Sequence, residues 1–175
     1  MSKTALKKEL QQLTKEQLVE QVLDLYSKNK SVKTFYDFYL NPKNEIELLE
    51  KCKRAIRKEF NVENPMRAGL KFSVAKRAIA ELKGLQVSSE TIADAMLYLA
   101  ESTCEFTSEW GDMDESFYTS AWNNFGAALE FMDKYSLLDN FQLRVKQCVK
   151  WASPCGYGFA DSIVDSYYQY YQDNI

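Results

Sequence analysis

The sequence predicts an all-α fold of about nine helices. Apolar residues recur at the 3.6-residue period of a helix, strand-like alternation is nearly absent, and breaks in the pattern fall at residues that end helices. With 175 residues, of which 46% are apolar and 14% aromatic, the chain can bury a sizeable core. Because short connections make sequential helices antiparallel neighbours, we expect stacked helical hairpins, a compact bundle or a short solenoid-like array.

The first three helices are expected to begin at Ser2, Thr14 and Ser31. Thr14 is followed three residues later by Gln17, which is the spacing of a capping box. Ser31 would cap a short aromatic helix. That helix should end before Pro42, because the residue preceding a proline disfavours helical geometry.

The fourth and fifth helices are separated by the longest loop signal in the chain. Asn44 is expected to open the fourth helix, and Ser73 the fifth. Gly84 should end the fifth helix in the left-handed conformation of a Schellman stop. The intervening residues 61–72 are interpreted as a functional or hinge loop inside a single domain that spans residues 1–175.

The last four helices are expected to begin near these positions: Ser88 or Ser89, Asp112 with Glu115, Asp139 with Gln142, and about residue 159. The ninth helix is rich in tyrosine. Phe159, Ile163, Val164, Tyr167 and Tyr171 fall on one helical face, so packing in a core is favoured over a platform for stacked bases.

Several chemistries are excluded by residues that the chain lacks. It contains no histidine, which rules out His-based acid/base catalysis, Ser-His and Cys-His dyads and mixed Cys/His zinc sites. No phosphate-loop or dinucleotide motif is present. The four cysteines form no CxxC pair and are expected to be reduced thiols. We therefore expect no cofactor.

The composition indicates a protein of the cytoplasm. The N-terminal residues lack the apolar centre of a signal peptide, and no apolar run approaches the roughly 18 residues of a membrane span. No membrane partner is expected. The sequence leaves open whether the protein is a monomer or a homodimer.

Charge is distributed unevenly along the chain. Residues 1–83 carry 18 basic and 11 acidic side chains, whereas residues 84–175 carry 4 and 14. The cations that are least easily paired within their own helices lie in the loop and in the first turns of the fifth helix: Arg67, Lys71, Lys76 and Arg77. Because free amides at a helix start also attract anions, this basic face is a candidate anion-binding site.

The expected sixth helix carries an acidic stripe opposite its apolar side. Its members are Glu90, Asp94, Glu101, Glu105 and Glu109. Like charges four residues apart cost about 0.2–0.5 kcal/mol per pair, so basic groups could lie opposite. Three interpretations remain open: a solvated face, internal pairing with the basic first half, or a metal or partner site. In the metal alternative, Glu101, Glu105 and Glu109 would bind Mg²⁺ or Mn²⁺ through oxygen.

Three segments, taken together, resemble a known family. They are LTKEQLVEQVLDLY (13–26), FYDFYLNP (35–42) and FTSEWGDMDESFY (106–118). In this order they are similar to a family of uncharacterised bacterial helical proteins catalogued as a domain of unknown function. The resemblance implies a bacterial cytoplasmic origin and a helical fold. It implies no catalytic residue and no ligand.

The sequence does not determine a biochemical function. The favoured hypothesis is a non-enzymatic interaction module that binds an unidentified protein partner, with nucleic acid as a possible partner of the basic face. The alternative hypothesis is a carboxylate-dependent protein that binds a divalent metal, or a hydrolase of that kind.

Overall fold

The computed structural model describes residues 2–41, 45–61, 63–111 and 113–172. Over these ranges the chain forms nine α-helices, one short 3-10 turn and no β-strand, which confirms the all-α prediction. Contacts between Cα atoms divide the chain into two compact units, the N-terminal unit (residues 1–44) and the C-terminal unit (residues 45–175). The loop at 61–72 lies inside the C-terminal unit.

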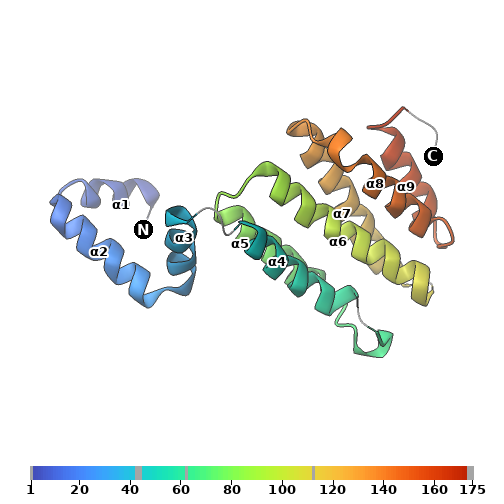
Figure 1. The fold of residues 1–175 in the computed structure, drawn as a ribbon, viewed down its shortest axis with the longest axis horizontal. Coiled ribbons are helices and arrows are strands. Elements are labelled where there is room, and N and C mark those ends of the chain that lie inside the picture. The colour runs from blue at the N-terminus through green and yellow to red at the C-terminus, as the bar shows by residue number, and fades with distance from the viewer. Residues whose placement is uncertain (1, 42–44, 62, 112, 173–175) are drawn as a thin grey trace. The chain divides into compact units, whose positions relative to one another are not determined.

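The N-terminal unit consists of three helices, drawn in blue in Figure 1: α1 (Lys3–Leu10), α2 (Lys15–Lys28) and α3 (Lys30–Leu40). The predicted starts at Ser2 and Thr14 are confirmed, and Thr14 and Gln17 form the reciprocal bonds of a capping box. The predicted cap at Ser31 is wrong. The side-chain oxygen of Asn29 accepts a hydrogen bond from the Ser31 N–H at 3.0 Å, so Asn29 caps α3 two residues earlier.

No residue of the N-terminal unit is buried within residues 2–41. Its helices are held by caps and by local contacts, chiefly between α2 and α3. The Tyr26 hydroxyl donates to the Asp37 carboxylate at 2.6 Å, and the Lys33 ammonium donates to the same carboxylate at 2.9 Å. These contacts are solvent-exposed, so each contributes little to stability.

The C-terminal unit is built around one central helix, α6. Figure 1 shows α6 between α4 and α5 on one side and α7 and α8 on the other, and α6 contacts all four. Helix α9 packs against α7 and α8. The six helices of this unit have the following bounds: α4 (Glu45–Phe60), α5 (Phe72–Gly84), α6 (Ser89–Trp110), α7 (Glu115–Lys134), α8 (Leu138–Ala152) and α9 (Phe159–Tyr168).

The core of the C-terminal unit is apolar and aromatic. Ten of the residues of α6 are buried, more than in any other described helix. At one end of the core the ring of Phe60 lies 4.9 Å from that of Phe72, which in turn lies 5.3 Å from Phe117, measured between centroids. The aromatic and aliphatic side chains of α9 and of the residues just after it also pack in the core. Those that are buried are Phe159, Ile163, Tyr167 and Tyr171, which confirms their predicted role in packing.

The structure confirms only some of the side-chain caps that the sequence predicts for the helices of this unit. Ser88 caps α6, as expected. The predicted caps at Ser73 and Asp139 are wrong, because α5 begins after Lys71 and α8 after Leu137, and neither helix has a side-chain cap bond. Asn44 and Asp112 lie outside the described residues. Helix α7 is capped by Asp114, whose carboxylate accepts a hydrogen bond from the Phe117 N–H at 2.9 Å.

The stop of α5 also differs from the prediction. Gly84 is still part of the helix, and the left-handed residue that follows is Gln86, with φ of 58°. Gly111, in contrast, follows the last residue of α6 and has φ of 95°. None of the helices in the described ranges combines the length and the apolar character needed to cross a bilayer.

Candidate functional site

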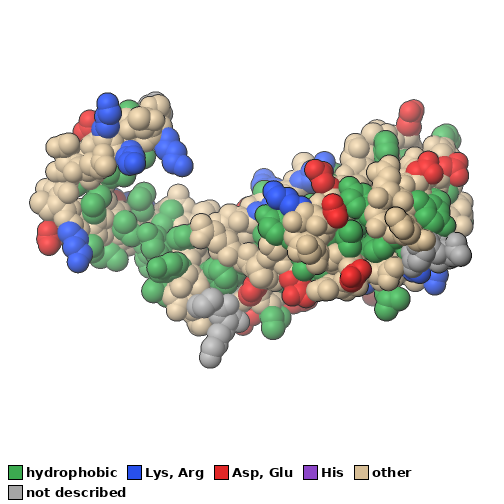
Figure 2. All heavy atoms as spheres, turned by 90° about the horizontal axis from the view of Figure 1, so that it is seen from above, with side chains coloured by type: hydrophobic (Ala, Val, Ile, Leu, Met, Phe, Trp, Pro, Cys, Tyr) green, Lys and Arg blue, Asp and Glu red, His purple; other side chains and the backbone are tan. Residues whose placement is uncertain are grey.

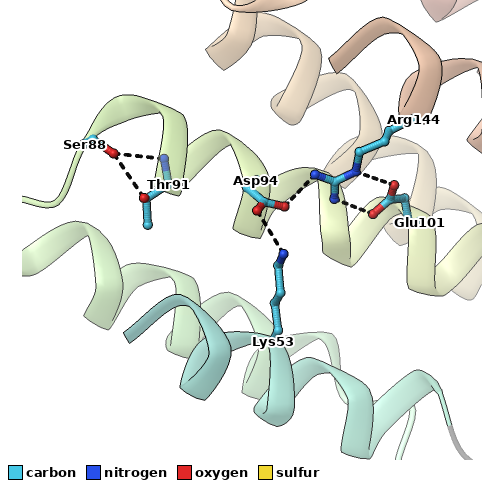
Figure 3. A network of polar contacts seen from close by, with 6 residues as sticks. All are labelled: Lys53, Ser88, Thr91, Asp94, Glu101 and Arg144. Carbon is cyan, nitrogen blue, oxygen red and sulfur yellow. Dashed lines mark hydrogen bonds and ion pairs between the residues drawn. The ribbon is translucent and has the colours of Figure 1, made fainter. Parts of the chain in front are cut away.

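Part of the acidic stripe of α6 lies against an arginine from α8. Asp94 and Glu101 are two helical turns apart and so share one face of α6. Both point toward Arg144 (Figure 3). The guanidinium donates from Nε and Nη2 to the two oxygens of Glu101, at 2.7 and 2.6 Å, and from Nη1 to Asp94 Oδ1 at 2.6 Å. This bidentate geometry is the stronger kind of ion pair.

A lysine from α4 completes this network. The Nζ atom of Lys53 lies 2.9 Å from Asp94 Oδ2, so Asp94 joins two cations (Figure 3). The four side chains are between 14% and 33% exposed. Burial alone would lower the pKa of Arg144, but its hydrogen bonds to Glu101 and Asp94 and the charges of these carboxylates raise the pKa above its usual value. The arginine is therefore permanently charged and paired.

The ion-pair network is a structural link between α4, α6 and α8. It explains how α6 tolerates its row of carboxylates, because Asp94 and Glu101 face cations rather than each other. Of the three interpretations of the stripe, pairing with the basic first half holds for Asp94 through Lys53, whereas Glu101 pairs with Arg144 of the second half. Only Lys53 comes from the basic first half of the chain. Arg144 was missed as a candidate, although it is one of only four basic residues in 84–175.

The other carboxylates of the metal alternative have different surroundings. The Asn61 amide donates to Glu105 at 2.9 Å. Partial burial, together with the charges of Glu109 and Glu101, raises the pKa of Glu105 above its usual value. Glu109 is exposed. Within the described ranges, no three or more Asp, Glu or Cys side chains form a group that could hold a metal ion. Divalent-metal binding at Glu101, Glu105 and Glu109 therefore stays a prediction. The described residues do not bring these carboxylates together as a set of metal ligands.

All four residues of the basic face are exposed. Arg67 ends the 3-10 turn Pro65–Arg67, Lys71 is the N-cap residue of α5, and Lys76 and Arg77 lie within α5. The ion pairs found between described residues involve none of the four. On the surface drawn in Figure 2, Lys and Arg side chains (blue) gather near the middle of the C-terminal unit, with acidic side chains (red) beside them.

The start of α5 already holds a carboxylate of the chain itself. The Lys71 N–H donates to Glu59 Oε2 at 3.1 Å. The same carboxylate lies against Gly69, where an added Cβ would come within 2.0 Å of Glu59 Oε2. The amide of Lys71, which precedes the helix, is therefore not available to an anion. The expectation for the amides in the first turn of α5 stays a prediction. An anion on the basic face would contact the side chains.

The segment 106–118 forms the turn between α6 and α7. Tyr118 closes this turn, because its hydroxyl oxygen accepts from the Met113 N–H at 3.2 Å and lies 2.9 Å from the hydroxyl of Thr107. Thr107 also donates to the carbonyl of Gly111 at 3.2 Å. These bonds satisfy polar groups at a helix end, so the segment is accounted for by local structure.

One comparison with known proteins gives a match. A family model described as "Family of unknown function (DUF6155)" matches residues 1–153. The chain belongs to this family. Searches of curated proteins and of solved structures find no match. All three segments that carried the resemblance, 13–26, 35–42 and 106–118, lie within the matched residues. Membership of DUF6155 thus confirms the resemblance to a family of unknown function and assigns no activity.

Proposed function

We propose that this protein is a non-enzymatic interaction module whose basic face, Arg67, Lys71, Lys76 and Arg77, binds an acidic surface of a partner protein. One observation carries the proposal. The cations of the ion-pair network, Lys53 and Arg144, are neutralised inside the unit, whereas the four cations of the basic face are exposed and take part in no ion pair between described residues. Exposed unpaired cations are free to steer and bind an anionic partner.

The N-terminal unit supports the same function. It presents half-exposed apolar side chains and buries none within residues 2–41. Short helices are marginal in water unless an apolar face is covered, so a partner would stabilise this unit.

A protein partner is favoured over nucleic acid. The C-terminal unit carries 20 acidic and 14 basic residues, so its overall charge would repel a phosphate backbone at long range. A local acidic patch on a protein would be repelled much less. We further propose that the module is bacterial and cytoplasmic and acts as a monomer or a homodimer.

The test compares binding of a poly-glutamate peptide and of a single-stranded oligonucleotide at low salt. Reversal of charge in Arg67→Glu/Lys71→Glu should abolish binding of the peptide. It should leave the melting temperature unchanged, because exposed charges contribute little to stability. The control variant, Lys134→Glu/Lys150→Glu, alters two exposed cations elsewhere on the unit by the same charge.

The outcomes separate the alternatives. Peptide binding that weakens as salt rises and is lost only in the basic-face variant supports the proposal. Tighter binding of the oligonucleotide would replace the protein partner by nucleic acid. Equal loss in the control variant, or no binding of either probe by the wild type, would refute the basic face as a recognition surface.

A further inference from the structure

A groove that neither the sequence nor the ion-pair network accounts for lies in the C-terminal unit. It has a volume of about 300 Å³ and runs between α5 and α7, with α6 as its floor. The residues that line it are Lys76, Ile79, Ala80, Lys83, Met96, Leu99, Asn123, Asn124 and Ala127. This volume is at the lower end of the range of about 300–1,000 Å³ for ligand pockets.

The lining has an apolar floor and a polar rim. Ile79 and Leu99 are buried, and Met96 beside them is partly exposed to the groove. The rim carries Lys76 and Lys83, one on each side of Ala80 along α5, and two asparagines from α7. None of the lining residues is acidic, although the C-terminal unit has more acidic than basic residues. The rim is therefore a local concentration of positive charge.

Lys83 lacks a carboxylate partner in the described part of the chain. It takes part in none of the ion pairs found there, and its Nζ lies 5.1 Å from the centre of the Phe131 ring. Although Lys83 is exposed overall, partial desolvation of its ammonium lowers its pKa. An anion in the groove would supply that missing interaction.

We propose that the groove between α5 and α7 binds a small carboxylate with a short apolar chain. The ammonium groups of Lys76 and Lys83 would hold the carboxylate. The apolar chain would lie on Ile79, Met96 and Leu99 and exclude water from the floor. An anion without an apolar chain would leave the apolar floor of the groove in contact with water. A neutral apolar molecule would leave the ammonium of Lys83 without a counterion.

This site goes beyond the proposed basic face and does not depend on it. The two share only Lys76, and Arg67 and Lys71 line no part of the groove. The two proposals can therefore fail independently, because charge reversal at Arg67 and Lys71 should leave the groove intact.

Octanoate is the probe, and a ¹³C-labelled methyl group on the methionines reports its position. Octanoate should shift the Met96 resonance more than that of the exposed Met66. Octanol and acetate should bind at least about tenfold more weakly, because each lacks one of the two interactions. Lys83→Met should weaken octanoate binding by about tenfold or more. Ala127→Phe, at an exposed rim position, should block the groove sterically.

The matched control is Lys134→Met. Lys134 also lies over an aromatic ring, with its Nζ 5.5 Å from the centre of Tyr135, but it does not line the groove. Binding lost in Lys83→Met and Ala127→Phe and kept in Lys134→Met supports the proposal, provided that all three variants melt at the temperature of the wild type. No shift at Met96, octanol binding as tight as octanoate, or equal weakening in the control would overturn it.

Discussion

Leucines in the two units follow the same helical period but have opposite surroundings. Leu23 of α2 is 59% exposed, whereas Leu97 of α6 is completely buried. The N-terminal unit has 44 residues and the C-terminal unit 131, and only the latter encloses a core within the described ranges. A domain of about 60 residues is already marginally stable, and a unit of 44 residues can bury still less of its surface.

This difference shows that helical period predicts helices and not a core. In the N-terminal unit, caps and exposed pairs such as Lys33 with Asp37 fix the helices locally. In the C-terminal unit, burial and the ion-pair network join helices that are distant in sequence. Recognition of a partner is accordingly expected from the surfaces that the core does not use.

The largest expected effect is a contrast between two leucines. Leu97→Ala should lower the free energy of unfolding of the full chain by about 2–5 kcal/mol, because it leaves a cavity in a core that cannot fully relax. Leu23→Ala should cost no more than about 0.5 kcal/mol, as expected for an exposed site. Urea denaturation followed by far-ultraviolet circular dichroism measures both. Equal losses would show that the N-terminal unit also has a covered apolar face.

The second prediction concerns the ion-pair network. Arg144→Met should lower the free energy of unfolding by about 2 kcal/mol, because it leaves two partly buried carboxylates with only Lys53 to offset their charge. The exposed Arg77 takes part in no ion pair between described residues, so Arg77→Met is the matched control and should change stability by less than about 0.5 kcal/mol. The same denaturation midpoint for both variants would contradict a stabilising role for Arg144.

The sequence predicted elements better than it predicted contacts. Caps such as Thr14 and Ser88 are visible because a hydroxyl and its backbone partner are only three residues apart. The pairing of Arg144 with Glu101 spans 43 residues and depends on α8 packing against α6, which no local pattern encodes. The exposure of Leu23 could not be predicted from the sequence either. An amphipathic helix has the same sequence pattern whether or not another element covers its apolar face.

The third prediction contrasts two glycines at helix ends. Gly84 lies within α5 with nothing within 4 Å of an added Cβ, so Gly84→Ala should stabilise the protein by about 0.5–1 kcal/mol. Gly111 has φ of 95°, so Gly111→Ala should destabilise it by about 1 kcal/mol. Thermal unfolding of both variants provides the measurement. A loss of stability in Gly84→Ala would instead indicate that Gly84 adopts the left-handed conformation that the sequence predicts for the end of this helix.

The fourth prediction is a pH dependence at Glu105. Its pKa in the folded protein is raised, so the folded state binds the proton more tightly than the unfolded state does. Glu105 therefore lowers stability as pH rises above its ordinary pKa of 4.5. Glu105→Gln should stabilise the protein slightly at pH 7. It should give no gain in stability below pH 4.5, where the carboxyl group is protonated in both the folded and the unfolded state.

The control for this prediction is Glu130→Gln, which removes an exposed carboxylate from α7. Denaturant midpoints of the two variants and the wild type, measured at several pH values, give the comparison. A gain for Glu105→Gln that persists at acidic pH, or an equal gain in the control, would contradict the role of burial at Glu105.

Hydrogen exchange of backbone amides in the full chain tests most directly whether stability resides in the C-terminal unit. Amides in the middle of α6 are expected to exchange only through global unfolding, whereas those of α1, α2 and α3 are expected to exchange with opening free energies near zero. Mass spectrometry of peptides from both units reports the two values in one experiment. Protection of α2 equal to that of α6 would contradict the account.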